Sequence, residues 1–429
     1  MYRTEEGLGV WEHRGKVAAV GVGHSLTERR WDGTPENSLG AWSIVALRNA
    51  IADSGIPADQ IDGLVLDTTT TTGAHWQDGD PIPMDVVNSF NPSDDPLDGI
   101  AKLSGDWLIK NMPELTNVKF TMVGPGCMSR AIVVAAQAVG DGLTKNCLVL
   151  KSWHNLPGRY YQGGANANPT RADAGKWSNW AGPASYGTAQ QFQRYMHKYG
   201  KSHDDMAPFM TNSRRNGLNF PEGYWAQHRP EELTAEDYVN ARWVAKPANL
   251  FDNDIPIMCS AAYVFTTADH AKDLPNKPVY ILNHASSRTP SRGLVPTLEE
   301  CEADTFRTGR MLYEGAGITA SDLSFENMYD GFSLFHVFHM EGLRYAGVQP
   351  GEALDFFKGD ISNEGPNPVS PSGGNIGSGR TRFWMHTDSI QQISGRAGAR
   401  QITKAAEVGV SGGPMPMGGD FTVWGASPD

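Results

Sequence analysis

Short apolar runs alternate with longer amphipathic segments along this chain, and the alternation predicts strands and helices in turn. Residues 16–23, KVAAVGVG, predict a strand, and residues 38–67 predict a helix, a Gly-Ile turn, a short acidic turn and a second strand. Residues 129–143, SRAIVVAAQAVGDGL, predict a helix that is apolar on nearly every face and is therefore central. Residues 146–155 predict a buried strand. This order is typical of an α/β protein with layered sheets.

The same order of elements returns far downstream. Residues 277–286 predict a strand, and residues 299–330 predict a helix, a Gly-Ile turn, an acidic turn and a strand. The two patterns align when residues 55–56 are placed on residues 317–318. Two halves of one topology explain the similarity, and a chance likeness between two ordinary βαβ units is the alternative.

Between the halves, residues 156–187 are rich in Gly, Asn, Trp and Tyr and have no periodicity. Helices are predicted over about 188–217 and 234–243, the second opened by a capping-box pattern of Thr234 and Asp237. Insertions of this kind in α/β enzymes usually cover a site or form a subunit interface. We therefore expect an N-terminal half from residues 1–155 and 244–275, an inserted loop domain from residues 156–243, and a C-terminal half from residues 276–429.

Composition and charge exclude several classes of protein. The chain has 429 residues, 39% hydrophobic and 20% charged, with 12 Trp, 13 Tyr and 16 Phe, far too many aromatics for a disordered chain. A net charge of −12 argues against nucleic acid as a partner, because phosphate binding needs a basic face. The opening residues, MYRTEEGLGVWEHRGK, lack an apolar signal segment, and no run approaches the roughly 18 apolar residues of a membrane span. The sequence predicts a cytoplasmic protein.

The four cysteines, Cys127, Cys147, Cys259 and Cys301, are scattered and form no CxxC pair. We therefore expect neither a metal site nor a disulfide framework in this chain. Cys127 stands at the start of the predicted helix over 129–143, where a helix N-terminus favours the reactive thiolate. A small, buried and inert cysteine is the alternative interpretation.

The clearest candidate chemistry is ENMYDGFS, residues 326–333, where Tyr329 and Asp330 stand side by side inside an apolar segment. A strand that leads into a helix normally buries apolar or small residues at this point. A phenol and a carboxylate there indicate a reactive site, and a buried tyrosine bonded to a backbone group is the alternative.

Three stretches, in order along the chain, resemble the sterol-carrier-protein-type branch of the thiolase superfamily. Residues 16–30 resemble its opening strand, residues 233–256 resemble the segment that leads out of its loop domain, and residues 390–402, IQQISGRAGARQI, resemble its last long helix. The resemblance covers nearly the whole chain. It implies a five-layered αβαβα fold of two similar halves, a dimeric core, acyl-CoA substrates and no permanently bound cofactor.

The resemblance implies that the chemistry lies in four loops, and the first two depart from the thiolase pattern here. In MVGPGCMSRAIVVAAQAV the place of the nucleophile falls on Pro125, with Cys127 two residues later. The second loop reads His-Asp-Cys-Phe in sterol-carrier-type thiolases and Asn-Glu-Ala-Phe in degradative ones. Residues 329–332 of this chain read Tyr-Asp-Gly-Phe.

The third loop, PSGGNIGSGRTRFWMHTD, also departs, because Arg380 stands where thiolases have the histidine of Gly-His-Pro. His386 follows six residues later and is a further candidate. The fourth, glycine-rich loop is retained as SGGPMPMGG. The glycines of these two loops that we expect to bind substrate are Gly373, Gly374, Gly379, Gly412 and Gly413.

Claisen chemistry needs a thiolate and a base, and both are displaced here. Retro-aldol cleavage needs only hydrogen-bond donors for an enolate oxygen and a base for a β-hydroxyl proton. Thiolase-like aldolases that shorten steroid or bile-acid side chains carry the same Tyr-Asp-x-Phe motif and lack the cysteine and the Gly-His-Pro. The resemblance therefore implies cleavage of a β-hydroxyacyl-CoA to a ketone and a short acyl-CoA, with Tyr329 as acid/base, Asp330 supporting it and Arg380 as a cationic neighbour.

Two other functions stay open at this point. One is a thiolase or acyltransferase that uses Cys127, and the other is a non-catalytic subunit that binds acyl-CoA or lipid. The resemblance also implies a small partner with an OB-fold and a zinc ribbon, and any zinc must lie on that partner. The tail 418–429 and Trp177, Trp180 and Trp225 are candidate interface residues, or else they pack the loop domain onto its own core or the homodimer mate.

Overall fold

The computed structural model of the chain describes residues 2–67, 98–100, 103–124, 129–153, 184–288, 296–381, 383–415 and 418–429. Its strands determine the architecture. The strands are β1 (Val17–His24), β2 (Gly63–Asp67), β3 (Phe120–Gly124), β4 (Asn146–Trp153), β5 (Trp243–Ala245), β6 (Ala248–Asn249), β7 (Cys259–Thr267), β8 (Val279–Ser286), β9 (Phe325–Met328), β10 (Val408–Gly413) and β11 (Asp420–Gly425).

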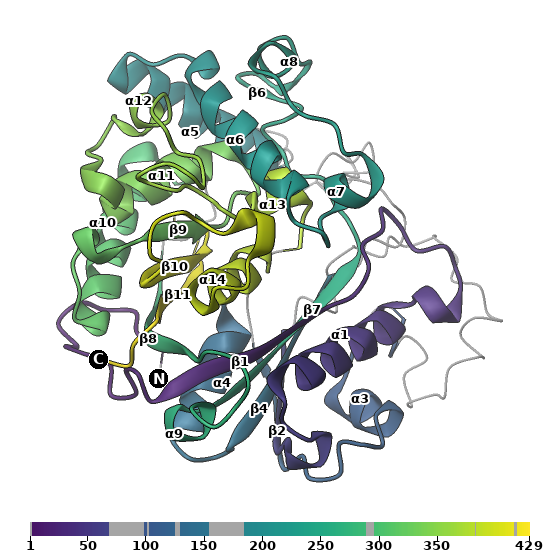
Figure 1. The fold of residues 1–429 in the computed structure, drawn as a ribbon. Coiled ribbons are helices and arrows are strands. Elements are labelled where there is room, and N and C mark those ends of the chain that lie inside the picture. The colour runs from purple at the N-terminus through teal and green to yellow at the C-terminus, as the bar shows by residue number, and fades with distance from the viewer. Residues whose placement is uncertain are drawn as a thin grey trace, which may run out of the picture.

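The helices alternate with these strands (Figure 1). They are α1 (Leu39–Ser54), α3 (Gly105–Asn111), α4 (Arg130–Gly140), α5 (Ala184–Tyr199), α6 (Ala207–Leu218), α7 (Tyr224–His228), α8 (Ala235–Val239), α9 (Ala268–Ala271), α10 (Leu298–Ala316), α11 (Ser333–Leu343), α12 (Ala353–Phe356), α13 (Gly374–Ser378) and α14 (Trp384–Ser394). Within the described part of the chain, no helix is both long and apolar enough to cross a bilayer.

Nine strands of the described chain form one hydrogen-bonded array in the order β3-β2-β4-β7-β1-β8-β11-β10-β9. In the N-terminal half β2 and β4 are parallel, and β7 runs antiparallel to β4 and β1. In the C-terminal half β9 and β10 are parallel, and β11 runs antiparallel to β10 and β8. The halves meet where β1 pairs with β8. The internal duplication predicted from the sequence is therefore confirmed, because β1, β2, β4 and β7 correspond to β8, β9, β10 and β11.

The matching Gly-Ile turns end matching helices. Helix α1 ends at Gly55 (φ 72°) and α10 ends at Gly317 (φ 64°), both in the left-handed region that glycine adopts without steric cost. A 3₁₀ turn follows each helix and leads into β2 or β9. Helix α10 also begins with a capping box of Thr297 and Glu300.

Alternate residues of the strands face two different apolar cores. On β1, Ala18 and Val20 belong to the core that α1, α10 and α11 cover, whereas Val17 and Ala19 belong to the core around α4 and α14. Because both faces of the sheet are buried, its strands are nearly continuous apolar runs. The layers run from α1, through the first half of the sheet, to the central α4 and α14, and on through the second half to α10 and α11. This is the five-layered αβαβα order.

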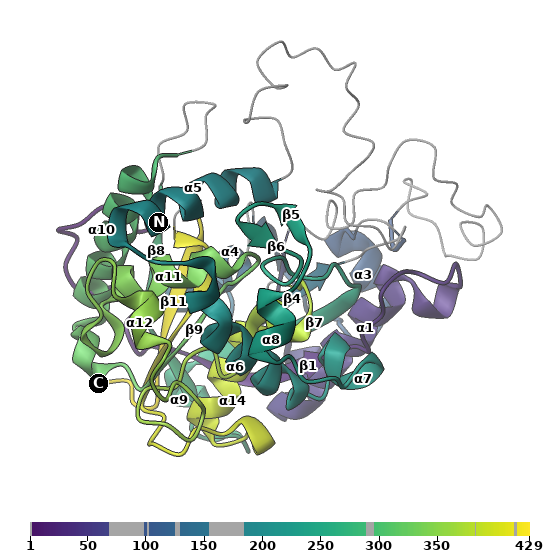
Figure 2. The ribbon, with the colours of Figure 1, turned by 90° about the horizontal axis from the view of Figure 1, so that it is seen from above.

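Helices α5, α6 and α8 gather on one side of the molecule, where α6 lies against α13 (Figures 1 and 2). The backbones approach closely there, because a Cβ added to Gly217 would lie 1.9 Å from the carbonyl oxygen of Gly377. The capping box of Thr234 and Asp237 is confirmed, but α8 is shorter than the predicted helix over 234–243, since it ends at Val239 and β5 begins at Trp243. Residues 154–183, with most of the aromatic insertion, Trp177 and Trp180, lie outside the described residues. The boundaries of the three domains stay a prediction.

One expectation is wrong, and one open alternative is decided. Residues 390–402 do not continue one long helix, since α14 ends at Ser394, Gly395 is left-handed (φ 74°) and a 3₁₀ turn follows. The tail does not offer its aromatic residues to a partner, because Phe421 and Trp424 are fully buried in β11. Trp225 is half-buried and lies between the guanidinium groups of two arginines of the inserted region, Arg214 and Arg229.

Candidate active site

The turn between β9 and α11 carries Tyr329 and meets the fourth loop. The N–H of Tyr329 donates to the carbonyl oxygen of Gly412 at 2.9 Å, because β9 runs parallel to β10. A Cβ added to Gly413 would lie 3.3 Å from the Cβ of Tyr329. The fold therefore brings the predicted acid/base and the two glycines of the fourth loop side by side.

The phenol of Tyr329 folds back over its own turn. Its side chain is buried in a small apolar cluster with Phe332, Phe335 and Met385. A Cβ added to Gly331 would lie only 2.0 Å from the phenolic oxygen. The turn needs glycine at this position for the hydroxyl to lie where it does.

Asp330 is fully buried and binds the third loop. Its Oδ1 accepts the backbone N–H of Asn375 at 2.5 Å, at the start of α13. The pKa of Asp330 is raised to about 7, chiefly by burial and to a lesser extent by the charge of Asp254, against the lowering effects of His336 and of the amides of Asn375 and Ile376. Asp330 can therefore hold or release a proton near neutral pH, and it joins the second and third loops.

Arg380 is also buried, and its charge is paired. Its Nε donates to Oδ1 of Asp254 at 2.8 Å, and a terminal guanidinium nitrogen contacts the same oxygen. The other oxygen of Asp254 accepts from Nδ2 of Asn375 at 3.1 Å. Asn375 thereby connects the carboxylates of Asp330 and Asp254. Sequence reasoning missed Asp254 and Asn375, although two aspartates inside FDNDIP, next to apolar residues, were a usable signal.

His386 binds different partners in the central layer. Its Nδ1 lies 2.7 Å from Oγ of Ser411 on β10, and its Nε2 lies 3.1 Å from Oγ of Ser129, which precedes α4. Burial, with a smaller effect of the charge of Lys151, lowers the pKa of His386 to about 3. His386 is therefore a neutral imidazole that ties the start of α4 to β10. Cys127, two residues before Ser129, lies outside the described residues.

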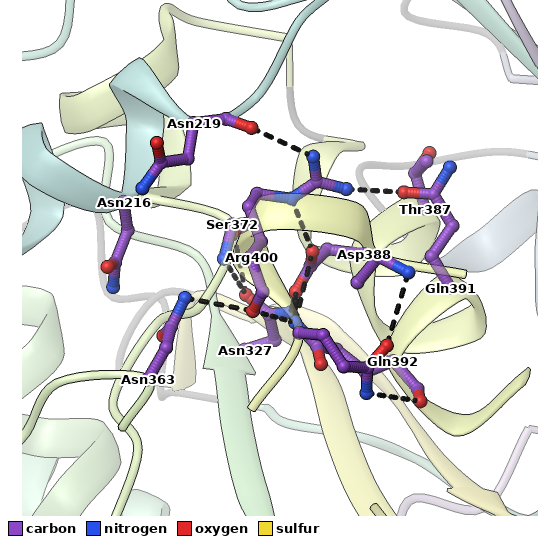
Figure 3. Close-up of polar contacts among 12 residues, drawn as sticks. Asn216, Asn219, Asn327, Asn363, Ser372, Thr387, Asp388, Gln391, Gln392 and Arg400 are labelled. Carbon is purple, nitrogen blue, oxygen red and sulfur yellow. Dashed lines mark hydrogen bonds and ion pairs between the residues drawn. The ribbon is translucent and has the colours of Figure 1, made fainter. Parts of the chain in front are cut away.

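A buried polar network holds the third loop onto β9 and α14 (Figure 3). Oδ1 of Asn327 accepts from the hydroxyl of Ser372 at 2.6 Å, and its Nδ2 donates to Asp388 at 2.8 Å. Asp388 in turn pairs with Nε of Arg400 at 2.7 Å, and Arg400 donates to the carbonyl oxygen of Asn219 beyond α6. These bonds fix where the loop that carries Arg380 can lie.

The three described cysteines are buried and unreactive in character. Burial raises the pKa of Cys301 to about 12, and it also raises the pKa values of Cys147 and Cys259. No cluster of three or more His, Cys, Asp or Glu side chains suited to a metal ion occurs among the residues that the structure describes.

Known proteins share this architecture. A family model described as "Thiolase C-terminal domain-like" matches residues 299–421. The Ltp2-ChsH2(DUF35) aldolase, a solved structure, superposes with a TM-score of 0.75 over 96% of this chain and 98% of that one, at 21% identity. The chain has the thiolase fold.

Two curated relatives extend the similarity of this thiolase-fold chain over most of its length. It is 25% identical to the 17-hydroxy-3-oxo-4-pregnene-20-carboxyl-CoA lyase of Mycobacterium tuberculosis, over 94% of this chain and 99% of that protein. It is also 25% identical to the steroid side-chain-cleaving aldolase of Thermomonospora curvata, over 85% of this chain and 86% of that protein.

The thiolase fold brings most of the predicted site residues to one region. Tyr329 touches the fourth loop and Asp330 binds the third, and Asn375 and Asp254 connect Asp330 to Arg380. Gly373, Gly374 and Gly379 all have positive φ in the third loop, and Gly412 and Gly413 have positive φ in the fourth. His386 is bonded instead to the start of α4 and to β10.

Proposed function

We propose that this chain is a carbon–carbon lyase that cleaves a β-hydroxyacyl-CoA side chain, of steroid or bile-acid type, by a retro-aldol reaction. The products are a ketone and a short acyl-CoA. Similarity over nearly the full length of two steroid side-chain lyases supports the reaction class. The observation that carries the proposal is the position of Tyr329, at the turn after β9 and beside Gly412.

In the proposed reaction Tyr329 acts as the deprotonated phenolate, and its oxygen takes the proton of the substrate's β-hydroxyl. The bond between Cα and Cβ breaks, Cβ becomes the ketone, and the electron pair forms the enolate of the short acyl-CoA. Backbone N–H groups of the third and fourth loops, where the five expected glycines lie, are the proposed donors to the enolate oxygen. A proton returned from Tyr329 to Cα completes the acyl-CoA, so that the tyrosine ends as it began.

Asp330 and Arg380 act through the loops that they hold. Asp330 is bonded to Asn375, so we propose that it supports Tyr329 by fixing the third loop against the turn, and that its near-neutral titration lets it buffer a proton there. Arg380 supplies a positive charge to this part of the site, and the carboxylate of Asp254 balances that charge. The substrate is a coenzyme A thioester and no other cofactor takes part in the proposed reaction.

The test replaces Tyr329 with Phe, which keeps the ring packing and deletes only the oxygen that transfers the proton. Turnover of a steroid β-hydroxyacyl-CoA, followed as release of ketone and short acyl-CoA by liquid chromatography and mass spectrometry, should fall by about 10²–10⁴-fold. Acyl-CoA binding should remain. The matched control is Tyr345→Phe, another buried phenol, which donates to the carbonyl oxygen of Pro368 away from the turn. Near-normal turnover of Tyr329→Phe would refute the assignment.

Cys127→Ala separates this reaction from a thiolase or acyltransferase. The lyase does not need a thiolate, so the variant should keep turnover within about twofold of the wild type, and iodoacetamide should not abolish it. Complete loss in Cys127→Ala would instead support acyl transfer. Unchanged acyl-CoA after incubation of the wild type, alone and with a partner, would support a non-catalytic binding subunit.

We further propose that the chain forms a homodimer and works with a small partner that has an OB-fold and a zinc ribbon. Strand β3 lies at the edge of the described sheet and exposes 45% of Met122 and 47% of Val123, and such apolar edges tend to pair with another strand. One similar solved structure bears the name Ltp2-ChsH2(DUF35) aldolase, which supports a second protein as partner. Light scattering should give a dimer, and a chain that is fully active when purified alone would refute an obligatory partner. A cytoplasmic location stays a prediction.

A further inference from the structure

Residues 252–256, which we call the strap, cross from the inserted region to the candidate site. The N–H of Asp254 donates to the carbonyl oxygen of Gly331 at 3.3 Å, and the N–H of Ser333 donates to the carbonyl oxygen of Asp252 at 3.1 Å. The strap therefore runs along the turn that follows Tyr329 and is bonded to it on both sides of Phe332.

The far end of the strap holds the third loop. The N–H of Arg380 donates to the carbonyl oxygen of Ile255 at 2.7 Å, next to the bridge between Pro256 and Arg380. The carboxylate of Asp254 binds the Arg380 guanidinium and the amide of Asn375. One short segment thus sets the distance between the turn of Tyr329 and the loop of Arg380.

Asp252 is the point where the inserted region holds the strap. Its Oδ1 accepts from the hydroxyl groups of Ser333, at 2.5 Å, and Tyr238, at 2.7 Å. Its Oδ2 lies 2.9 Å from Nε2 of His203 and accepts the N–H of Asn249 at 2.6 Å. Asp252 is only 2% exposed, so these four hydrogen bonds replace the ones that its carboxylate would make with water.

The two aromatic partners of Asp252 support each other. His203, in a 3₁₀ turn, and Tyr238, in α8, stack with ring centroids 4.7 Å apart and planes 12° apart. Burial lowers the pKa of His203, but the hydrogen bonds and charges of Asp252 and Asp204 outweigh it and leave the pKa above its ordinary value. When His203 carries a proton, it forms an ion pair with the buried carboxylate of Asp252.

We propose that His203, Tyr238 and Asp252 are positioning residues, which set the rate at the Tyr329 site by holding the strap and, through Ser333, the turn. The inference rests on the proposed lyase function. None of the three needs to touch substrate, since their hydrogen bonds reach the turn through Asp252. A shift of about 1 Å in a reacting group can cost about 10²-fold in rate, so a loosened strap should lower kcat.

The test is Tyr238→Phe, which deletes the hydroxyl that donates to Asp252 and also lies 2.9 Å from Nε2 of His203, and which keeps the stacked ring. We expect kcat to fall by about tenfold with KM within about twofold. Hydrogen–deuterium exchange should quicken at the amides of Ser333 and Asp254 and stay unchanged in β1. The matched control is Tyr199→Phe, whose hydroxyl donates to Glu302 at 2.7 Å, away from the strap, and which should change neither readout.

A second variant, Ser333→Ala, deletes the other hydroxyl on the same carboxylate oxygen. The double variant should lose less kcat than the product of the two single fold-losses, because both substitutions release the same strap. Unchanged kcat and exchange in Tyr238→Phe, or a rise in KM alone, would overturn the proposal. If the wild type shows no lyase turnover, the proposed function fails, while the exchange result still decides whether these residues hold the turn.

Discussion

Replacing Gly331 with Ala perturbs the position of the phenolic oxygen without touching Tyr329 itself. The added Cβ would lie 2.0 Å from that oxygen and 2.4 Å from the ring carbon that bears it. Ordinary van der Waals contact begins at 3.4 Å, so the oxygen must retreat by roughly 1.4 Å if the turn stays in place. The atoms in the way belong to a side chain, so the ring of Tyr329 has to move against Phe332, Phe335 and Met385 while the backbone keeps its shape.

We therefore expect a large loss of rate and a moderate loss of stability. A displacement of this size should lower kcat by about 10²-fold, because proton transfer needs the donor and acceptor within hydrogen-bond reach. The free energy of unfolding should fall by about 1–3 kcal/mol, the usual cost of crowding a packed cluster, and no backbone hydrogen bond has to break. The two readouts together distinguish a displaced acid/base from a misfolded turn.

The assay is steady-state turnover of a steroid β-hydroxyacyl-CoA, with urea unfolding of the same preparations. Gly105→Ala is the matched control, because a Cβ there lies 3.7 Å from its nearest neighbour, on Thr121, far from the turn. Turnover of Gly331→Ala within about twofold of the wild type, with the fold intact, would refute the role of Tyr329 or the position of its hydroxyl.

Two further predictions concern the buried carboxylates. Asp254→Ala removes the carboxylate that pairs with Arg380. The free energy of unfolding, measured by urea titration, should fall by about 3–5 kcal/mol because a buried charge is left unpaired. The double variant Asp254→Leu with Arg380→Met should recover most of that stability. Asp330 has a folded-state pKa of about 7 against an ordinary value of 3.8, so the folded protein binds more protons than the unfolded one between these pH values. The protonated carboxyl contributes its full stability below about pH 4, and up to about 4 kcal/mol is lost as pH rises to about 7. Asp330→Asn should remove this pH dependence of the free energy of unfolding. An unchanged slope in Asp330→Asn would show that another group titrates.

Local patterns were enough to predict the duplicated frame. Glycine at residues 55 and 317 marks a helix end because the left-handed region is open to it, and that preference lies in the residue itself. Apolar runs such as residues 16–23 predict strands buried on both faces because the period of a strand is two residues. The same local reasoning applies to Gly395. It ends α14, so the long helix expected over 390–402 does not form.

The amino-acid sequence by itself therefore determined the two matching halves and pointed to Tyr329 and Asp330 as unusual residues in an apolar turn. Only the tertiary structure decided that Asp254 pairs with Arg380, 126 residues away, and that Asp330 binds the backbone of Asn375. Such partners depend on how strands and loops distant in the chain come to lie together, and no spacing in the sequence encodes that. Burial then sets the charge states, because the energy of a carboxylate or imidazole depends on the groups that replace its water.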